Sequence, residues 1–159
     1  MSAAKDELKC ILLTLQSENV IVPNAAVAEI IPSRNVEEIA GTPDWIMGSM
    51  RWRGYDVPLV SFEAAGMLGG SLSTSTQIAV LYSISDNDDL PYMGLAISGV
   101  PHVSFFSRTQ ITEDPMATGA HPMVMQKIRV NGAAASVLDL QAMEKMVREH
   151  LPGIAPNDI

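Results

Sequence analysis

Short apolar runs, each the length of one β-strand and each closed by turn residues, constrain this chain most strongly. The clearest case is Asn131-Gly132, which stands between the β-rich runs 123–130 and 133–138. Asn-Gly favours a type I′ turn, because both residues tolerate positive φ and this turn matches the twist of the flanking strands. The sequence therefore predicts a β-hairpin at this place.

The same pattern of strand and turn recurs along the rest of the chain. Further strand-length runs lie at 10–15, 20–22, 47–53, 57–62, 77–84, 92–98 and 100–105. Only residues 140–151 repeat apolar side chains at helical spacing, and Asp139 precedes them as a candidate N-cap. These features predict an all-β sandwich or barrel with one C-terminal helix, and the Ser/Thr-rich segment 71–76 suggests a division into two lobes.

The charge balance excludes several classes of partner. The chain carries 10 Lys and Arg against 18 Asp and Glu, for a net charge of -8. Binding to nucleic acid or to an anionic membrane depends on an excess of Lys and Arg, so neither partner is expected. The polar start, residues 1–9, has no apolar signal region, and no run reaches the roughly 18 apolar residues of a membrane span. We therefore expect a cytoplasmic protein with no direct membrane insertion.

No pattern in the sequence supports catalysis or metal binding. A single cysteine, Cys10, excludes an internal disulfide and a cysteine-based zinc cluster, and we expect it buried in a strand. The histidines His102, His121 and His150 lack the spacing of a helical metal pair, and His121 is expected to be a solvated loop residue. The expected site therefore has no catalytic residue, no metal and no cofactor.

The residues that stand out are instead gathered in one predicted hairpin, Met50-Arg51-Trp52-Arg53-Gly54-Tyr55. Gly54 is expected in the turn, Arg51 and Arg53 on one strand face, and Trp52 on the opposite, inward face. Arg, Trp and Tyr dominate the energetics of protein interfaces, so this hairpin is a candidate binding surface. A purely structural alternative, with Trp52 in the core and both arginines paired to nearby acids, remains open at this point.

Several pieces of the sequence follow one another in an order that resembles the CheW-like domain, the adaptor of bacterial chemosensory arrays. Those pieces are Val27-Ala28-Glu29-Ile30-Ile31-Pro32, the segment 42–48, Arg53-Gly54, Val57-Pro58-Leu59-Val60 and Val137-Leu138-Asp139-Leu140. They are similar, in this order, to the family's V-x-E-I-I motif, the segment that precedes its Arg-Gly motif, and that Arg-Gly motif itself. The last two are similar to the following h-P-h-h motif, in which h is a hydrophobic residue, and to the closing L-D-L motif. Ser61 departs from the pattern, since the family commonly has Asp there.

This resemblance implies a fold of two packed five-stranded SH3-like β-barrel lobes with a C-terminal helix. It implies one domain over residues 1–159, with lobes divided near 71–76 and the C-terminal segment free to return to the first lobe. It implies no catalysis, but an adaptor between the cytoplasmic tip of a methyl-accepting chemoreceptor and the regulatory domain of a CheA-type histidine kinase. By position, Arg53 would lie near the receptor groove with Gly54 in its turn, and Val27, Glu29 and Ile30 near the kinase contact.

Two further expectations accompany this interpretation. Arg51-Trp52 and the string 57–63 are similar to accessory CheW-like proteins of pilus-type (twitching) chemosensory systems. The alternative function is that of a small β-barrel protein that binds an apolar ligand between its lobes, near the Met-rich segment 116–130.

Overall fold

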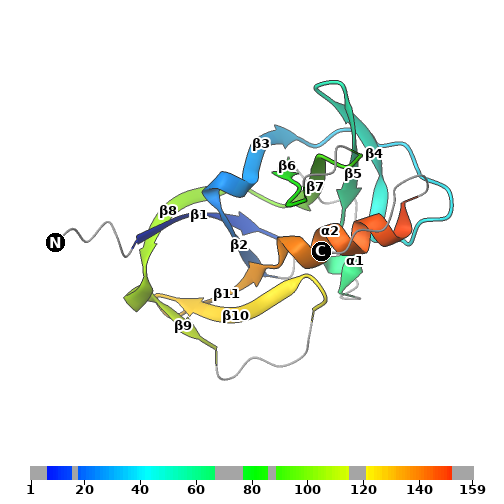
Figure 1. Cartoon of the computed structure of the whole chain (residues 1–159). Coiled ribbons are helices and arrows are strands. Elements are labelled where there is room, and N and C mark those ends of the chain that lie inside the picture. Colours follow the sequence, from blue (N-terminus) through cyan, green and yellow to red (C-terminus); the bar gives the residue numbers. More distant parts are fainter. Residues whose placement is uncertain (1–6, 16–17, 67–76, 86–88, 115–120, 152–159) are drawn as a thin grey trace.

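The computed structural model describes residues 7–15, 18–66, 77–85, 89–114 and 121–151. Within these ranges the chain forms two sheets, and a C-terminal helix lies across their junction (Figure 1). The prediction of an all-β fold with one C-terminal helix is confirmed. Two short single-turn elements of 3-10 helix and one short α-helix, α1 (Phe62–Ala65), complete the described structure.

The first sheet has six strands in the order β8-β1-β2-β11-β10-β9. These strands are β1 (Glu7–Thr14), β2 (Asn19–Pro23), β8 (His102–Ser107), β9 (Ile111–Glu113), β10 (Val124–Val130) and β11 (Ala133–Leu138). The predicted hairpins β1–β2 and β10–β11 are confirmed, and Asn131 and Gly132 have the positive φ angles of 51° and 84° that a type I′ turn requires.

The second sheet has five strands in the order β3-β6-β7-β5-β4. They are β3 (Val27–Pro32), β4 (Ile46–Trp52), β5 (Tyr55–Val60), β6 (Gln77–Tyr82) and β7 (Tyr92–Ile97). Five strands were expected in each lobe. The first sheet has six, because the 3-10 turn η4 (Arg108–Gln110) divides one stretch of chain into β8 and β9, which pair with different neighbours.

The two sheets do not divide at the segment 71–76, which lies outside the described residues. The strands on either side of that segment, β5 and β6, both belong to the five-stranded sheet. The chain instead leaves the six-stranded sheet through the turn η2 (Asn24–Ala26) after β2, and it returns between β7 and β8. The late strand β11 pairs in parallel with β2, so both ends of the chain contribute to one sheet.

One large apolar core lies between the two sheets. It contains side chains from both sheets, from α1 and from the C-terminal helix α2 (Leu140–His150), including the fully buried Leu13, Phe62, Leu95, Met143 and Val147. Side chains of the five-stranded sheet form a smaller apolar cluster around Trp52 and Met50. Side chains of the six-stranded sheet form another around Cys10 and Ile128. The space between the lobes, where the alternative function requires an apolar ligand, is therefore occupied by side chains of the described residues.

Both α-helices begin at a residue that the sequence indicated. The Asp139 carboxylate accepts a hydrogen bond from the Ala142 amide at 3.0 Å and caps α2. Ser61, which stands where the family commonly has Asp, accepts from the Ala64 amide at 3.2 Å and caps α1. The Ser61 hydroxyl therefore caps this helix in place of an Asp carboxylate.

A buried ion pair fastens α2 to the loop between β6 and β7. Arg148 donates from Nε to Glu144 at 2.8 Å, from Nη1 to Asp89 at 2.8 Å and from Nη2 to the Ser85 hydroxyl at 3.0 Å. Glu144 also accepts from the amides of Ile84 at 2.6 Å and Ser85 at 3.1 Å. Burial alone would raise the pKa of Glu144, but these hydrogen bonds outweigh it and hold the pKa below its ordinary value.

His121 is buried, so its prediction as a solvated loop residue is wrong. Its ring stacks on Phe62 with 3.9 Å between the ring centres, and Nδ1 accepts from the Met123 amide at 3.0 Å. Nε2 therefore donates to the Phe62 carbonyl at 2.7 Å, and the neutral imidazole has both nitrogens satisfied. Burial lowers the pKa of His121, because it disfavours the charged form.

Candidate partner-binding surface

The tip of the β4–β5 hairpin is a two-residue turn made by Arg53 and Gly54. Their φ angles are 48° and 83°, and Gly54 supplies the second positive angle without steric conflict. Arg53 is thus a turn residue, and it does not share a strand face with Arg51 as expected. Arg51 instead pairs across the hairpin with Asp56 at 2.9 Å, where both side chains are exposed.

Glu29 brings the two predicted parts of the site together. Its Oε1 accepts from the indole Nε1 of Trp52 at 2.8 Å and lies 3.3 Å from Nη2 of Arg53. The Arg53 guanidinium also lies over the Trp52 ring, 4.7 Å from the ring centre. Trp52 is buried as expected, whereas Arg53 stays exposed, so the arginine is held in place by a carboxylate below it and an aromatic face beside it.

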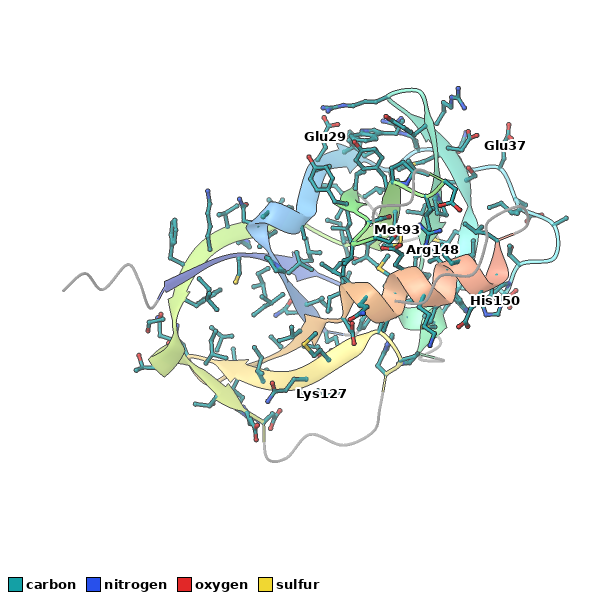
Figure 2. All side chains as sticks on the ribbon, viewed as in Figure 1. Glu29, Glu37, Met93, Lys127, Arg148 and His150 are labelled. Atoms are coloured by element: carbon teal, nitrogen blue, oxygen red, sulfur yellow. The ribbon has the colours of Figure 1, made fainter. Side chains whose placement is uncertain are left out.

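This contact also joins the two edges of the five-stranded sheet. Glu29 belongs to edge strand β3 and Trp52 to edge strand β4, and Figure 2 shows Glu29 at the end of the sheet where the β4–β5 hairpin projects. A second link is the backbone bridge between Glu37 and Ser49, with amide-to-carbonyl distances of 2.9 and 2.8 Å. Together they close the sheet into a barrel around the core cluster of Trp52.

All three tyrosines of the chain gather at the same end of the barrel. The ring centre of Tyr92 lies 4.8 Å from Trp52, 5.1 Å from Tyr55 and 5.6 Å from Tyr82. Tyr55 and Tyr82 remain about half exposed, at 45% and 46%. Sequence reasoning identified Tyr55 but missed the other two, because only the register that pairs Tyr82 with Tyr92 brings β6 and β7 to this hairpin.

Arg34 is a further residue of this region that sequence reasoning missed. Its Nη1 donates to the Arg51 carbonyl at 3.0 Å, which places a third exposed arginine beside the hairpin. The connector after β3 carries Arg34, and the connector lies along β4 through the bridge of Glu37 to Ser49. No local pattern in the sequence indicates that pairing.

Val27 and Ile30 do not join the hairpin. Both are half-buried on β3 and pack against the large core between the sheets. Of the eight predicted residues, the structure therefore connects Glu29, Trp52 and Arg53 directly, with Tyr55 joined to them through Tyr92. Arg51 and Gly54 lie on the same hairpin, and Val27 and Ile30 contribute to the core.

A second exposed apolar area lies on the six-stranded sheet. Val103 and Phe105 on edge strand β8 are 55% and 59% exposed and share one face of the sheet, whereas the exposed Leu8 of β1 pairs with Phe106 and points to the opposite face. The Lys9 ammonium lies 5.9 Å from the centre of the Phe105 ring. The unpaired backbone groups of an edge strand are free to pair with another chain, so β8 is an exposed feature of the six-stranded sheet.

Other kinds of site find little support in the described residues. There, no group of three or more His, Cys, Asp or Glu side chains is arranged to hold a metal, and no helix is both long and apolar enough to cross a membrane. A cavity of about 680 Å³ lies along the connector 38–44, next to Met47 and Ala64, with Glu38 and Asp44 among its lining residues.

Comparisons with known proteins agree with this architecture. The family model of the CheW-like domain matches residues 9–147. Among solved structures, the scaffolding protein CheW from Thermoanaerobacter tengcongensis is similar, with a TM-score of 0.68, 19% sequence identity and coverage of 84% of each chain. No curated protein matches the chain. Proteins of the CheW family are non-catalytic scaffolds, and this chain belongs to the family of CheW-like domains.

Proposed function

We propose that this protein is a cytoplasmic adaptor that couples methyl-accepting chemoreceptors to a CheA-type histidine kinase. Its membership of the CheW-like family supports a chemotaxis adaptor role in general. The observation that carries the more specific proposal is the exposed Arg53, which Glu29 and Trp52 hold in a fixed position at the hairpin tip. A pre-positioned arginine loses little conformational freedom when a partner binds.

An adaptor needs at least two contact surfaces, and the two proposed here adjoin at Glu29, which belongs to β3 and contacts Arg53 of the hairpin. The hairpin at the end of the five-stranded sheet is our candidate for the receptor contact, and β3 around Val27, Glu29 and Ile30 is our candidate for the kinase contact. Exposed surfaces of moderate size suit contacts that form and dissociate during signalling.

The test is capture of the cognate receptor's cytoplasmic fragment by the purified protein and by its Arg53→Glu variant. Reversal of this charge is expected to abolish receptor capture, because it removes the guanidinium and places a second carboxylate beside Glu29. Lys145→Glu, an exposed charge reversal on α2, is the matched control and should capture receptor normally. Circular dichroism checks that both variants are folded, and unchanged capture by folded Arg53→Glu would refute the site.

For the pathway, we propose a pilus-type chemosensory system, on the similarity of Arg51-Trp52 and residues 57–63 to its accessory adaptors. A strain that lacks the gene should then show smaller twitching zones on a surface and normal swimming in soft agar. The reverse result would assign the adaptor to a flagellar pathway.

A further inference from the structure

The end of the five-stranded barrel presents ordered aromatic side chains to solvent. Tyr55 and Tyr82 each contact Tyr92, which in turn packs edge-on against buried Trp52. The exposed rings of Tyr55 and Tyr82 are therefore packed against Tyr92, and they lose little conformational freedom when a partner covers them. Tyrosine and arginine are enriched among the residues that dominate binding energy at protein interfaces.

Positive charge is concentrated around these rings. Arg34, Arg51 and Arg53 are three of the chain's ten basic residues, and the contact of Arg34 with the Arg51 carbonyl places two of them side by side. Glu29 and Asp56 are the carboxylates paired with them, so this group carries a net charge of about +1 on a chain whose total is -8.

The three guanidinium groups keep donors for a partner. Among the described contacts, each arginine uses one terminal nitrogen: Arg34 donates to a carbonyl, Arg51 donates to Asp56, and Arg53 forms an ion pair with Glu29. A guanidinium has five N–H groups in a fixed fork that matches a carboxylate. The remaining donors are suited to carboxylates that approach from solvent.

We infer that the surface formed by Tyr55, Tyr82, Arg34, Arg51 and Arg53, here named the tyrosine–arginine surface, binds an acidic protein segment that also presents apolar side chains. Carboxylates of that segment pair with the arginines, and its apolar side chains cover the tyrosine rings. Two copies of this chain each carry a net charge of -8 and repel one another overall, so a second copy is not the occupant that we infer. The inference rests on the proposed function, because it assigns this chemistry to the receptor.

The experiment measures the dissociation constant of the full-length protein for the cognate receptor's cytoplasmic fragment and, separately, for the kinase regulatory domain. The variants are Tyr82→Ala, Tyr82→Phe and Arg34→Gln, none of which lies in the hairpin already tested through Arg53. Phe105→Ala, an exposed aromatic on the other sheet, is the matched control for loss of a ring. Each measurement is made at low and at high salt, since salt screens attraction between exposed charges.

We expect Tyr82→Ala to weaken receptor binding about tenfold, while Tyr82→Phe, which keeps the ring, binds nearly as the wild type does. Arg34→Gln should weaken receptor binding and reduce the dependence of this binding on salt. Phe105→Ala should change neither the receptor affinity nor its dependence on salt. If the wild type binds receptor but Tyr82→Ala and Arg34→Gln bind equally well, the inference is wrong and the proposed function stands. If the wild type binds neither receptor nor kinase, both are wrong.

Discussion

Glu29 holds two different donors with one carboxylate oxygen, and the two contacts differ in kind. The hydrogen bond from the buried Trp52 indole satisfies a polar group that has left water, whereas the contact with Arg53 lies at the surface. A buried donor that loses its partner costs roughly 1–3 kcal/mol, whereas an exposed ion pair is worth about 0–1 kcal/mol. The structural importance of Glu29 therefore comes mainly from Trp52.

This difference predicts the stability of two variants. Glu29→Gln keeps an acceptor for the indole and should lower the free energy of unfolding by less than about 0.5 kcal/mol. Glu29→Ala removes the acceptor and should lower it by roughly 1–2 kcal/mol. Urea denaturation measures both, and equal values for the two variants would contradict the role assigned to the Trp52 hydrogen bond.

His121 predicts a pH dependence of stability. Burial lowers the pKa of His121 from an ordinary 6.5, so on acidification the unfolded chain takes up a proton before the folded chain does. The charges that bear on the ring are Glu18, Glu63 and Lys127. Stability is therefore complete above pH 6.5 and falls as the pH drops from there towards the lower, folded-state value.

The test compares the free energy of unfolding of the wild type and of His121→Gln at pH 7.5 and at pH 5.5. Between the pKa of His121 in the unfolded chain and its lower pKa in the folded chain, acidification should reduce the free energy of unfolding more in the wild type than in the variant. The difference should be up to about 1.4 kcal/mol per pH unit. Carboxylates titrate in both proteins, so their contribution to the pH dependence of the free energy of unfolding cancels in this comparison. Parallel pH profiles would show that protonation of His121 does not affect folding.

At the residue scale, the sequence predicted what depends on neighbours in the chain. The inward position of Trp52, the turn at Gly54 and the cap at Asp139 follow from local spacing, and the structure confirms them. The burial of His121 could not be predicted, because its stacking partner Phe62 lies 59 residues away. The gathering of the three tyrosines likewise depends on how the strands β5, β6 and β7 pair.

At the element scale, α2 is attached to the β6–β7 loop by charge as well as by its apolar face. Figure 2 shows Arg148 on the side of the helix that faces the sheet, whereas His150 lies at the helix end. Arg148→Met leaves Glu144 buried without its charged partner and should destabilise the protein by about 3 kcal/mol. The double variant Glu144→Gln, Arg148→Met keeps an acceptor for the loop amides and should be more stable than the single variant.

Guanidinium denaturation measures this series, with Lys145→Met on the exposed side of the same helix as the control. If the double variant is less stable than Arg148→Met, the cost does not arise from an unpaired carboxylate. The hydrogen bonds that lower the pKa of Glu144 add a second check, because their contribution is present above the ordinary pKa and is lost as the pH falls through the folded-state value.

Strand β4 and the connector approach each other closely at Gly48. A Cβ atom at this position would lie 2.5 Å from the Glu37 carbonyl oxygen, whereas one on Gly54 would meet nothing within 4 Å. Both glycines have positive φ, so Gly54→Ala should cost the backbone strain alone, about 1–2 kcal/mol, and Gly48→Ala should cost more. Thermal unfolding compares the two, and equal melting temperatures would contradict the close approach.

The strands themselves were predictable, but their assembly was not. Hairpins such as β10–β11 form between adjacent segments with a recognisable turn. The parallel pairs β2–β11 and β5–β7 join segments far apart in the chain, and no local pattern specifies them. For the same reason the Ser/Thr-rich segment 71–76, which lies outside the described residues, did not indicate the point where the chain changes sheets.

At the scale of the whole molecule, the described residues form two sheets around one shared core, with α2 across the junction (Figure 1). The two proposed contact surfaces, the β4–β5 hairpin and strand β3, both belong to the five-stranded sheet. A shared core holds the two surfaces in a fixed relation. Under the proposed function, this rigidity sets the geometry in which receptor and kinase are brought together.

The most direct test of the adaptor role is sedimentation velocity of the protein mixed with the receptor's cytoplasmic fragment and the kinase regulatory domain. One species that contains all three components is expected, and Arg53→Glu should remove the receptor from this species while the kinase domain remains. Binding of one partner that excludes the other, or no binding to either, would contradict the account.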